Sequence, residues 1–494
     1  MARDVLAFGP FRLDLRAHRL LRQSEPVPLS AHLVDLLALF AVRAGELLTK
    51  DALFEAIWPG VFVTDNTLAR AVADLRRALG DDPADPRYIQ TVARRGYRFV
   101  AEVGPAAPEA FPAGSGGGEE TYEELRQFVA SVTALERLRV DGLEEVRARL
   151  ERAAAVLPDY APVHVALASA LTLASEAMRS GGVPDREPAE RAVMSARRAC
   201  ELDPGLGEAW ATLAFALTSA GRSDQARAAA RQAVRLEPGS WRHHFRLAFA
   251  AWGEERLRAA RRTLELLPGF PYACFLGATV LVARGLLGEA RALTAEATAA
   301  APPGASERLP ASGLNWLQGA ITATDPATAG EALVSFAREI GTHDAGRLYS
   351  TEFVLDAHHW RAGLLARLGH ADAALADLRA ALAIEPQHPR SLAALGALLA
   401  RDASAEAGAI TERADRVLGS LVEGGRAAEA ALCHATRQTI GGDGPAAIAT
   451  LERLLDEAPL DRTGWTLPIE PWQTPLHGHA AFDVLRRRLA QRAA

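Results

Sequence analysis

The stretch VTDNTLARAVADLRRAL, residues 63–79, decides how the N-terminal part of this chain folds. Its first polar residues, Thr64, Asp65 and Asn66, carry side chains that accept hydrogen bonds from the free backbone N–H groups of a helix start. Apolar residues then recur at spacings of four, three and four, which places them on one face of a helix: Leu68, Val72, Leu75 and Leu79. The other faces are polar and basic, so the stretch predicts an amphipathic helix that is half core and half contact surface.

The flanking segments extend this helix into a larger arrangement. Short alternating bursts over residues 5–29 predict a small antiparallel sheet. Two further helices are predicted upstream and two strands downstream: helices at 30–44 and 49–58, strands at 88–92 and 97–100. The two strands enclose the basic tip Ala93-Arg94-Arg95-Gly96. Three helices followed by a basic hairpin are the plan of a winged helix-turn-helix.

Four motifs in this region follow one another in the order of a known family: FGPFRLDLRAHRLLR, VPLSAHLVDLLALFAVRAGELLTKDALFEAIWPG, TDNTLARAVADLRRALGDD and YIQTVARRGYRF. With them, residues 8–103 resemble the OmpR/PhoB-type winged-helix domain, the DNA-binding output domain of phosphorelay signal transduction. The resemblance implies a four-stranded N-terminal sheet, three helices and a C-terminal β-hairpin. It also implies that the third helix enters the major groove of DNA and that the hairpin tip reaches the adjacent minor groove.

The resemblance also implies which residues contact DNA. Carried over position by position, Asn66, Arg70, Ala73 and Asp74 fall at base or near-base contacts, and Arg76 falls at a phosphate-contacting arginine. The complete set that we predict for DNA binding is Asn66, Thr67, Arg70, Ala73, Asp74, Arg76, Arg77, Arg94, Arg95 and Arg98. Small alanines at 71 and 73, and Asp74 where many members carry arginine, depart from the family. The target sequence is therefore not inherited from it.

The loop between the second and third helices, residues 59–63, carries two apolar residues, Val61 and Phe62. In the resembling family this loop touches RNA polymerase, and Val61 with Phe62 would form such a contact. The alternative is that both residues close the small core. The sequence favours this second interpretation.

Length and composition limit the class of protein and the number of domains. With 494 residues, 49% apolar and 23% charged, the chain predicts a soluble globular protein of two or more domains. Its net charge of −6 leaves room for a local basic patch, which is what DNA binding requires. Three scattered cysteines fit a reducing compartment. No signal peptide, no preceding receiver domain and no run of about 18 apolar residues is found, so we expect a cytoplasmic protein of bacterial type, associated with the nucleoid when bound to DNA.

The domain boundaries follow from composition and from a repeat. We predict a winged-helix domain at 1–104, a linker rich in proline and glycine at 105–120, and a helical domain at 121–494. Prolines close several alanine-rich segments of the helical domain, and two of their spacings, Pro204 to Pro238 and Pro268 to Pro302, are 34 residues. That period with a closing proline is the signature of the tetratricopeptide (TPR) repeat.

The best repeat units are 207–240, 271–304 and 355–388, which carry small residues where paired helices pack closely. A shorter unit is expected before Pro268, an insertion near 175–187, and no assignment is made for 303–350. The fold class is therefore mainly α, a winged helix followed by a TPR-like α-solenoid with a concave face. Near the C-terminus, Trp465, Trp472 and Phe482 are expected to cap the last helix pair.

Catalytic and metal-binding patterns were sought and are missing from the sequence. There is no phosphate loop, no H-E-x-x-H, no C-x-x-C and no G-x-S-x-G. The adjacent histidines His243-His244 and His358-His359 point about 100° apart on a helix, so they do not share a metal easily. We therefore expect no enzymatic activity, no cofactor and no metal.

Two functions from different classes compete. The first is a sequence-specific transcriptional regulator that reads promoter DNA, bound as two copies on direct repeats, with the solenoid binding a protein or peptide on its concave face or mediating self-association. The second is a TPR scaffold whose winged helix has become a protein-interaction module. The first predicts salt-dependent affinity for duplex DNA, and the second predicts none.

Overall fold

The computed structural model describes residues 5–15, 19–23, 25–27, 29, 31–50, 52–53, 65–92, 95–105, 131, 135, 140–177, 187–299, 313–458 and 463–494. Backbone contacts divide the chain into two compact units: Met1–Leu138 with Glu144–Leu167, and Arg139–Leu143 with Ala168–Ala494. Most of the predicted linker, most of the helix predicted at 49–58, and the pair Val61 and Phe62 lie outside the described residues. The predicted domain boundaries therefore stay a prediction.

The first unit opens with an antiparallel sheet. Its strands are β1 Val5–Phe8, β2 Phe11–Asp14, β3 Arg19–Arg22, β4 Glu25–Val27 and β8 Gly104–Pro105, in the order β4-β3-β2-β1-β8. The four predicted strands are confirmed. A fifth is added because Gly104 and Pro105, at the start of the predicted linker, pair with Ala7 and Leu6.

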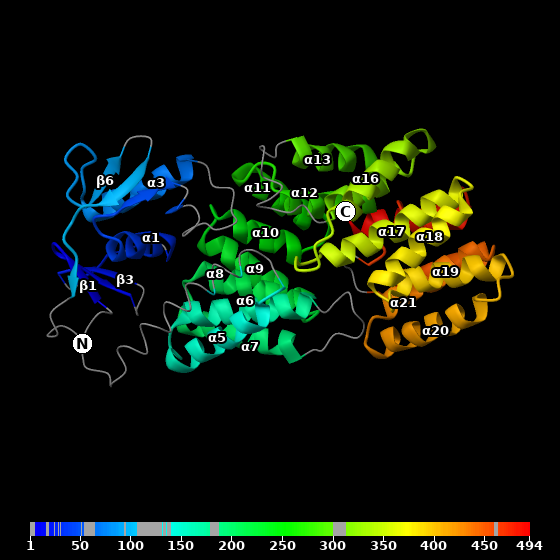
Figure 1. Ribbon diagram of the computed structural model, residues 1–494, viewed down its shortest axis with the longest axis horizontal. Helices are drawn as coiled ribbons and strands as arrows, with labels where there is room; N and C mark the ends of the chain where they lie inside the picture. Colours follow the sequence, from blue (N-terminus) through cyan, green and yellow to red (C-terminus); the bar gives the residue numbers. More distant parts are fainter. Residues whose placement is uncertain are drawn as a thin grey trace. The chain divides into compact units, whose positions relative to one another are not determined.

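The helices and the hairpin follow. They are α1 Ala31–Val42, β5 Leu47–Thr49, α3 Asp65–Leu79, β6 Ile89–Val92 and β7 Gly96–Phe99, and the three strands form a second sheet in the order β5-β7-β6. The predicted hairpin is thus present, and β5 extends it to three strands by pairing Leu47–Thr49 with Gly96–Arg98. Helix α1 lies between the N-terminal sheet on one side and α3 with the hairpin on the other (Figure 1).

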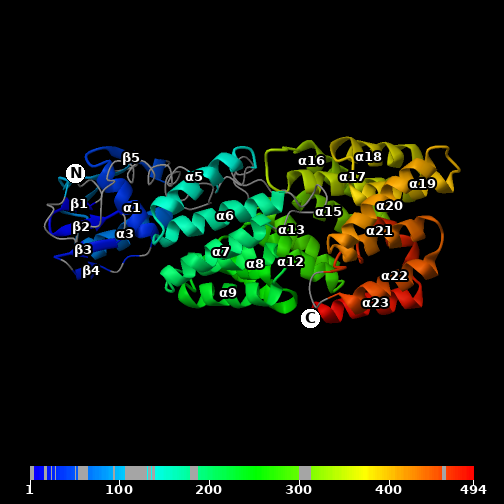
Figure 2. The ribbon, with the colours of Figure 1, turned by 90° about the horizontal axis from the view of Figure 1, so that it is seen from below.

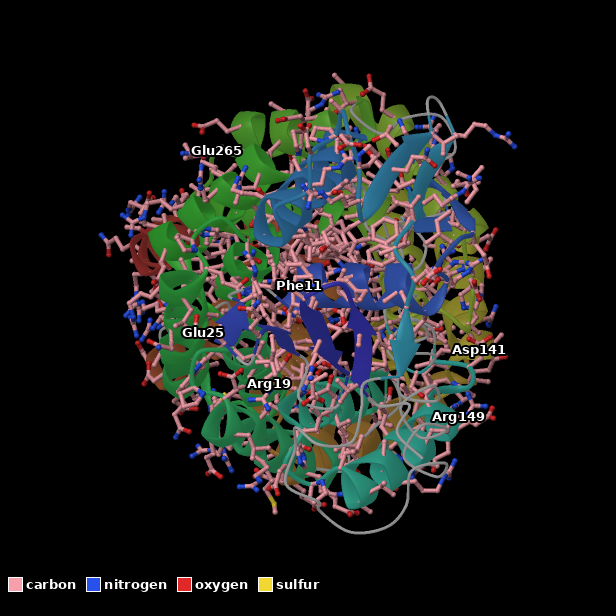
Figure 3. All side chains as sticks on the ribbon, turned by 90° about the vertical axis from the view of Figure 1, so that its left-hand side faces the viewer. Phe11, Arg19, Glu25, Asp141, Arg149 and Glu265 are labelled. Carbon is pink, nitrogen blue, oxygen red and sulfur yellow. The ribbon has the colours of Figure 1, made fainter. Side chains whose placement is uncertain are left out.

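Aromatic rings join these layers. Phe8, Phe11, Phe40 and Phe99 are each at most 2% exposed and belong to one core. The ring of Phe8 meets that of Phe99 edge-on at 5.2 Å, so β1 packs directly on β7. Figure 3 labels Phe11 beside the strands of the N-terminal sheet. Each such ring contributes about 1.5–3 kcal/mol by burial, so the two sheets and α1 form one structure.

A helical repeat follows (Figures 1 and 2). Its helices are α5 Leu143–Val156, α6 Ala161–Ala177, α7 Glu187–Leu202, α8 Gly207–Ser219, α9 Ser223–Leu236, α10 Trp241–Ala250, α11 Gly253–Leu266, α12 Pro271–Ala283, α13 Leu287–Ala299, α15 Leu314–Thr322, η3 Pro326–Thr328, α16 Ala329–Gly341, α17 Ser350–Arg367, α18 Ala371–Ile384, α19 Pro389–Arg401, α20 Ala407–Glu423, α21 Ala427–Ile440, α22 Gly444–Glu457, η4 Pro471–Leu476 and α23 Ala480–Arg492. From α8 to α22 they pack as successive antiparallel pairs. The predicted repeat architecture is confirmed, and 314–341 adds a helix pair that the sequence left unassigned.

Small residues bring the paired helices close together. Ala214 on α8 and Ala226, Ala230 and Ala233 on α9 are fully buried. On α12, a Cβ added to Gly277 would lie 2.9 Å from Cδ2 of Leu293 on α13, which is closer than real Cβ atoms approach. Alanine and glycine stand at these positions because a longer side chain would separate the helices.

The predicted short unit is the pair of α10 and α11, and its first helix ends at Ala250. The buried Arg256 of α11 explains where it ends: its Nε donates to the carbonyl oxygens of Ala248 and Ala251 at 2.9 and 2.8 Å. The guanidinium thus satisfies carbonyl groups that a continuing helix would have bonded internally. Its ring contact with Trp252, 4.9 Å to the centroid, fixes the position of the charge.

One side of the repeat stack is formed by the first helix of each pair, and we call this side the inner face. These helices are α8, α10, α12, α15, α17, α19 and α21. Residues 463–476, which we call the closing segment, fill the inner face along α17, α19 and α21 and reach Phe275 of α12 and Trp316 of α15 through Trp465. Trp472 donates its indole N–H to the carbonyl oxygen of His359 at 3.3 Å, and Gln473 hydrogen-bonds Thr436 and Thr439. Leu467, Ile469 and Leu476 are at most 2% exposed.

The expected aromatic cap is therefore wrong for two of its three residues. Trp472 packs on Ala362, Leu378 and Leu395 in the middle of the repeats, and Trp465 lies 6.1 Å from the ring of Trp316. Only Phe482 sits on the last helix, where it is fully buried. Prolines at 468, 471 and 475 prevent a regular α-helix here, so the closing segment follows the inner face as turns and the short 3-10 helix η4.

The closing segment buries ionisable groups around Arg390. Arg390 Nη1 lies 3.7 Å from Asp356 Oδ1, and a cavity of about 20 Å³ between Arg390, His359 and Glu470 is large enough for about one water molecule. Burial raises the pKa of Glu470 to about 7 and that of Asp356 to about 6. Burial, together with the charge on Arg390, lowers the pKa of His388 to about 3. His388 is thus held neutral.

The three cysteines, Cys200, Cys274 and Cys433, are buried, and burial raises the pKa of each thiol to about 12. A thiol with so high a pKa is a poor nucleophile. Within the described ranges, no helix combines the length and the apolar character that crossing a membrane requires.

We predict that His388→Asn flattens the pH dependence of stability. In the unfolded chain the imidazole takes up a proton near pH 6.5, whereas the folded protein resists it down to about pH 3. The stability that neutral His388 contributes is therefore complete above pH 6.5 and is lost as the pH falls towards 3. Between pH 7.5 and 5.5 the wild type should lose about 1 kcal/mol more than the variant, measured by thermal unfolding at each pH.

Asparagine retains a group that can bond the hydroxyl of Ser391, which His388 Nδ1 contacts at 2.8 Å. Glu470 and Asp356 titrate in both proteins. Their contribution to the pH dependence of stability, which is opposite in sign to that of His388, therefore cancels in the comparison. Equal losses of stability in the two proteins would contradict the prediction.

Candidate nucleic-acid interface

Helix α3 forms the interface that the sequence singled out. Leu68, Val72, Leu75 and Leu79 are at most 3% exposed, so the predicted apolar face is confirmed. Gly80 ends the helix with φ of +67°, a conformation that glycine adopts at little cost. Because these four apolar side chains are buried, the residues on the opposite side of α3 face solvent.

The solvent side of α3 combines a small residue with a cation. Ala73 is exposed, and 78% of the Arg77 side chain is exposed. Positions 66, 70, 73 and 77 recur at spacings of four, three and four and therefore share one face. Asn66, Thr67 and Arg70 lie on α3, but their side chains are outside the described part of the structure. A face that carries alanine at its centre lets the helix backbone approach a partner closely.

Asp74 is not a free negative charge on this surface. Its Oδ1 accepts a hydrogen bond from Arg77 Nη1 at 2.8 Å. The pair is exposed and contributes little to stability, about 0.3–0.5 kcal/mol. Its effect on the surface is larger, because the guanidinium neutralises a carboxylate that would otherwise repel phosphate groups.

Arg76 binds the hairpin. Its Nη2 donates to the carbonyl oxygen of Ile89 at 2.7 Å and to Thr91 Oγ1 at 2.8 Å, both on β6. The sequence predicted a phosphate contact for this arginine, and that contact stays a prediction. In the structure Arg76 couples α3 to the hairpin and so positions both.

Asp81, just beyond α3, is the residue that sequence reasoning missed. It is 8% exposed, and its Oδ1 accepts hydrogen bonds from the backbone N–H groups of Arg87 and Tyr88 at 2.7 and 3.1 Å. Its Oδ2 accepts from the N–H of Ile89 at 2.9 Å. The carboxylate thus fixes where β6 begins. The motif LRRALGDD contained a signal, an acidic pair after a helix-ending glycine, but nothing local showed which backbone it binds.

The hairpin is held against β5 by a close approach. A Cβ added to Gly96 would lie 1.9 Å from the carbonyl oxygen of Leu48, and the φ of Gly96 is +148°. Only glycine satisfies both conditions. Beside it Arg95 is exposed, and Arg98 is half-buried on β7 opposite Leu47 and Gln90. Arg94 lies outside the described residues.

The structure therefore brings together part of the predicted set. Asp74 and Arg77 meet on α3, and Arg76 joins α3 to β6. Arg95 projects from the far end of the same hairpin. Exposed arginine at two ends of a rigid helix and hairpin unit suits a polyanion, because guanidinium groups bind phosphate oxygens through directed hydrogen bonds.

We predict that Asp81→Asn loosens the hairpin. The amide nitrogen cannot accept a hydrogen bond, so at least one backbone N–H of residues 87–89 loses its acceptor, at a cost of about 1–3 kcal/mol. Hydrogen exchange measured by mass spectrometry should show faster exchange over 87–99. The matched control is Asp82→Asn, whose exposed carboxylate bonds only the N–H of Ala84 among the described residues. Unchanged exchange in Asp81→Asn, or equal acceleration in both variants, would contradict this role.

Comparison with known families places two domains in the chain. Residues 24–99 match the family described as transcriptional regulatory protein, C terminal, and residues 207–250 match the tetratricopeptide repeat. The chain thus carries an OmpR/PhoB-type DNA-binding domain and a TPR repeat, as the motifs predicted. The first match contains α3, Asp81 and the hairpin.

Curated relatives share this domain. The chain is 30% identical over 129 residues to the transcriptional activator CadC of Escherichia coli, covering 23% of this chain and 25% of CadC. It is 31% identical over 143 residues to the cholera toxin homolog transcriptional activator of Vibrio parahaemolyticus, covering 28% and 48%. The matched part therefore spans a quarter to a half of the length of these relatives.

A solved structure also matches this domain. The DNA-binding domain of RstA from Klebsiella pneumoniae, in complex with the RstA box, is 30% identical, covering 20% of this chain and 98% of that chain, with a TM-score of 0.19.

Proposed function

We propose that this protein is a sequence-specific transcriptional regulator that binds promoter DNA through α3 and the hairpin. One observation carries the proposal: Arg76 and Asp81 fix α3 and the hairpin as one unit. Its exposed surface presents a small residue, Ala73, beside the cation Arg77. A rigid helix with a small side chain at the centre of its exposed face and an arginine at the edge suits the major groove. There the base edges lie between two rows of phosphates.

The residues divide into two roles. Asn66, Thr67, Arg70, Ala73 and Asp74 would face base edges, because they lie towards the N-terminal and central part of α3. Arg76, Arg77, Arg94, Arg95 and Arg98 would contact phosphates along the backbone. Contacts of the second kind release counterions and give affinity without sequence preference. Contacts to base edges discriminate between DNA sequences.

The repeat domain would supply regulation. The matches cover the relatives only in part, so what the rest of the chain binds is proposed here and not inherited. We propose a protein or peptide partner on the inner face. Two copies would bind head to tail on direct repeats, because one winged helix contacts a short site. Val61 and Phe62 remain candidates for a contact with RNA polymerase.

The decisive experiment is a selection of bound fragments from sheared genomic DNA with the full-length protein at two salt concentrations. We expect one short repeated motif to be enriched, with affinity that falls steeply as the salt concentration rises. Enrichment of no motif even at low salt would contradict the regulator and would favour the scaffold, whose winged helix binds protein.

We predict that Arg77→Ala weakens binding to all sequences about equally. It removes a phosphate contact and leaves the Asp74 carboxylate unneutralised, so affinity should fall about tenfold or more and the salt dependence should flatten. Binding isotherms on the selected site and on unrelated DNA would measure this. The matched control is Arg379→Ala, an arginine of the repeat domain that is 53% exposed and paired with Glu406 at 3.0 Å.

Arg70→Ala should behave differently. We expect it to relax the preference at one base position, at a cost of about 1–3 kcal/mol on the selected site and little on unrelated DNA. Repeating the selection with this variant tests the assignment. An unchanged motif would show that Arg70 does not read a base.

A further inference from the structure

Positive charge is concentrated in one part of the repeats. Residues 223–266, from the start of α9 to the end of α11, contain nine arginines against five carboxylates, a net charge of +4, whereas the whole chain carries −6. The second helices of the other pairs each hold at least as many carboxylates as arginines: α7, α13, α16, α18, α20 and α22. A local excess of this kind, more than the net charge of a protein, decides where a polyanion binds.

Helices α9 and α11 are the second helices of their pairs and therefore lie on the side opposite the inner face, where Figure 2 shows α9 at the margin of the stack. Arg231 of α9 donates to both carboxylate oxygens of Glu255 of α11, from Nε at 2.6 Å and from Nη2 at 2.8 Å. Short turns reverse the chain after α9 and again after α10, so α9 and α11 run in the same direction. Arg235 and Arg258 thus lie on the same side of this ion pair, each about one turn beyond it.

Three exposed arginines on this side face no carboxylate of the described residues. Arg235 donates to a neutral acceptor, the side-chain oxygen of Gln232, at 3.1 Å. Arg258 and Arg261 form no hydrogen bond or ion pair with the part of the chain that the structure describes, and both are exposed. They are three positions apart and share one face of α11. We call Arg235, Arg258 and Arg261 the basic outer surface.

The other exposed residues of α9 and α11 indicate which kind of partner this surface fits. With the three arginines, the exposed set is Ser223, Asp224, Gln225, Ala228, Arg231, Arg235, Arg258, Arg261, Arg262 and Glu265. None of these is aromatic or a large apolar residue. Protein partners bind mainly through such anchors, and the bases of a single strand stack on aromatic rings. The backbone of a duplex requires neither, because guanidinium groups bind its phosphate oxygens directly.

We propose that the basic outer surface binds the phosphate backbone of duplex DNA that flanks the site of the winged helix. The inference rests on the DNA binding proposed above and adds to it a second contact, which is independent of sequence. Once α3 holds its site, the flanking duplex is tethered to the same chain, and its effective concentration at the repeats is raised. Three arginines that would bind free DNA weakly then add affinity without selecting a sequence.

The test compares two lengths of duplex DNA bound by the full-length protein. The short duplex contains only the motif enriched by the selection, and the long duplex extends it on each side by about 30 base pairs, or about three helical turns. We expect the long duplex to bind more tightly and with a steeper dependence on salt concentration. Each phosphate contact adds about 0.9 to the slope of log affinity against log salt concentration, so three contacts add about 2 to 3.

Replacing the three arginines together by glutamine, as Arg235→Gln, Arg258→Gln and Arg261→Gln, should remove this difference. The triple variant should bind the long duplex about tenfold more weakly than wild type at low salt, and the short duplex equally well. A triple lysine variant should retain the steeper slope, because lysine also neutralises phosphate groups.

The matched control makes the same change in net charge elsewhere on the repeats. It replaces Arg291, Arg379 and Arg401 by glutamine, three arginines whose side chains are 47%, 53% and 51% exposed and are paired with carboxylates. The control should bind both duplexes as wild type does. Because every substituted side chain is exposed and glutamine suits a helix, all variants should unfold at the temperature of the wild type, which thermal unfolding checks.

Several outcomes would overturn the flanking contact while DNA binding by the winged helix stands. They are equal binding of the two duplexes by wild type, a glutamine variant that still distinguishes them as wild type does, and a control that loses as much affinity as that variant. A lysine variant that behaves like the glutamine variant would also exclude a role of the charge. Failure of the wild type to bind either duplex would contradict DNA binding itself. Arg77→Ala separates the two levels, because it should weaken binding to both lengths alike.

Discussion

The proposed DNA-binding surface depends on the hydrogen bonds that the carboxylate of Asp81 accepts. The carboxylate gathers three consecutive backbone N–H groups at the start of β6, immediately after α3 ends. Arg76 then ties the same strand to the helix from the other side. Neither residue needs to touch DNA to matter for recognition, because a helix and a hairpin that moved independently could not match a major groove and a minor groove at once.

Local periodicity in the sequence was enough to predict α3, the hairpin and the repeats. The spacing of Leu68, Val72, Leu75 and Leu79 marks a buried face wherever the partner lies, and the 34-residue period marks a helix pair that repeats. Long-range contacts carry no such period. The closing segment reaches the inner face through contacts that span 34 to 113 residues. Asp81 with 87–89 and Arg256 with the end of α10 are only five to eight residues apart, but each contact joins separate elements and follows no period. The same limit applies to the site: the sequence named Arg76 and Arg77 but could not separate the arginine that holds the hairpin from the one that faces solvent.

Alanine and arginine have different structural roles in the repeats. Alanines such as Ala226 and Ala230 set the distance between paired helices, and their burial makes each pair a tight unit. Arginines on the same helices stay at the edges, where most of them pair with glutamate or aspartate, as Arg231 does with Glu255.

Contacts between distant repeats also constrain how this protein can evolve. Arg284, at the end of α12, donates to the carbonyl oxygen of Ala493 at 2.8 Å, and Gly253 leaves no room for a Cβ beside the carbonyl oxygen of Ala494. Tyr349 likewise bonds Glu176, a residue of α6. An open array tolerates duplication or loss of a unit, because each repeat contacts only its neighbours. Here one more unit between α13 and α23 would move these groups apart by the thickness of a helix pair. These contacts therefore constrain the number of repeats between α6 and α23, unlike in an open array.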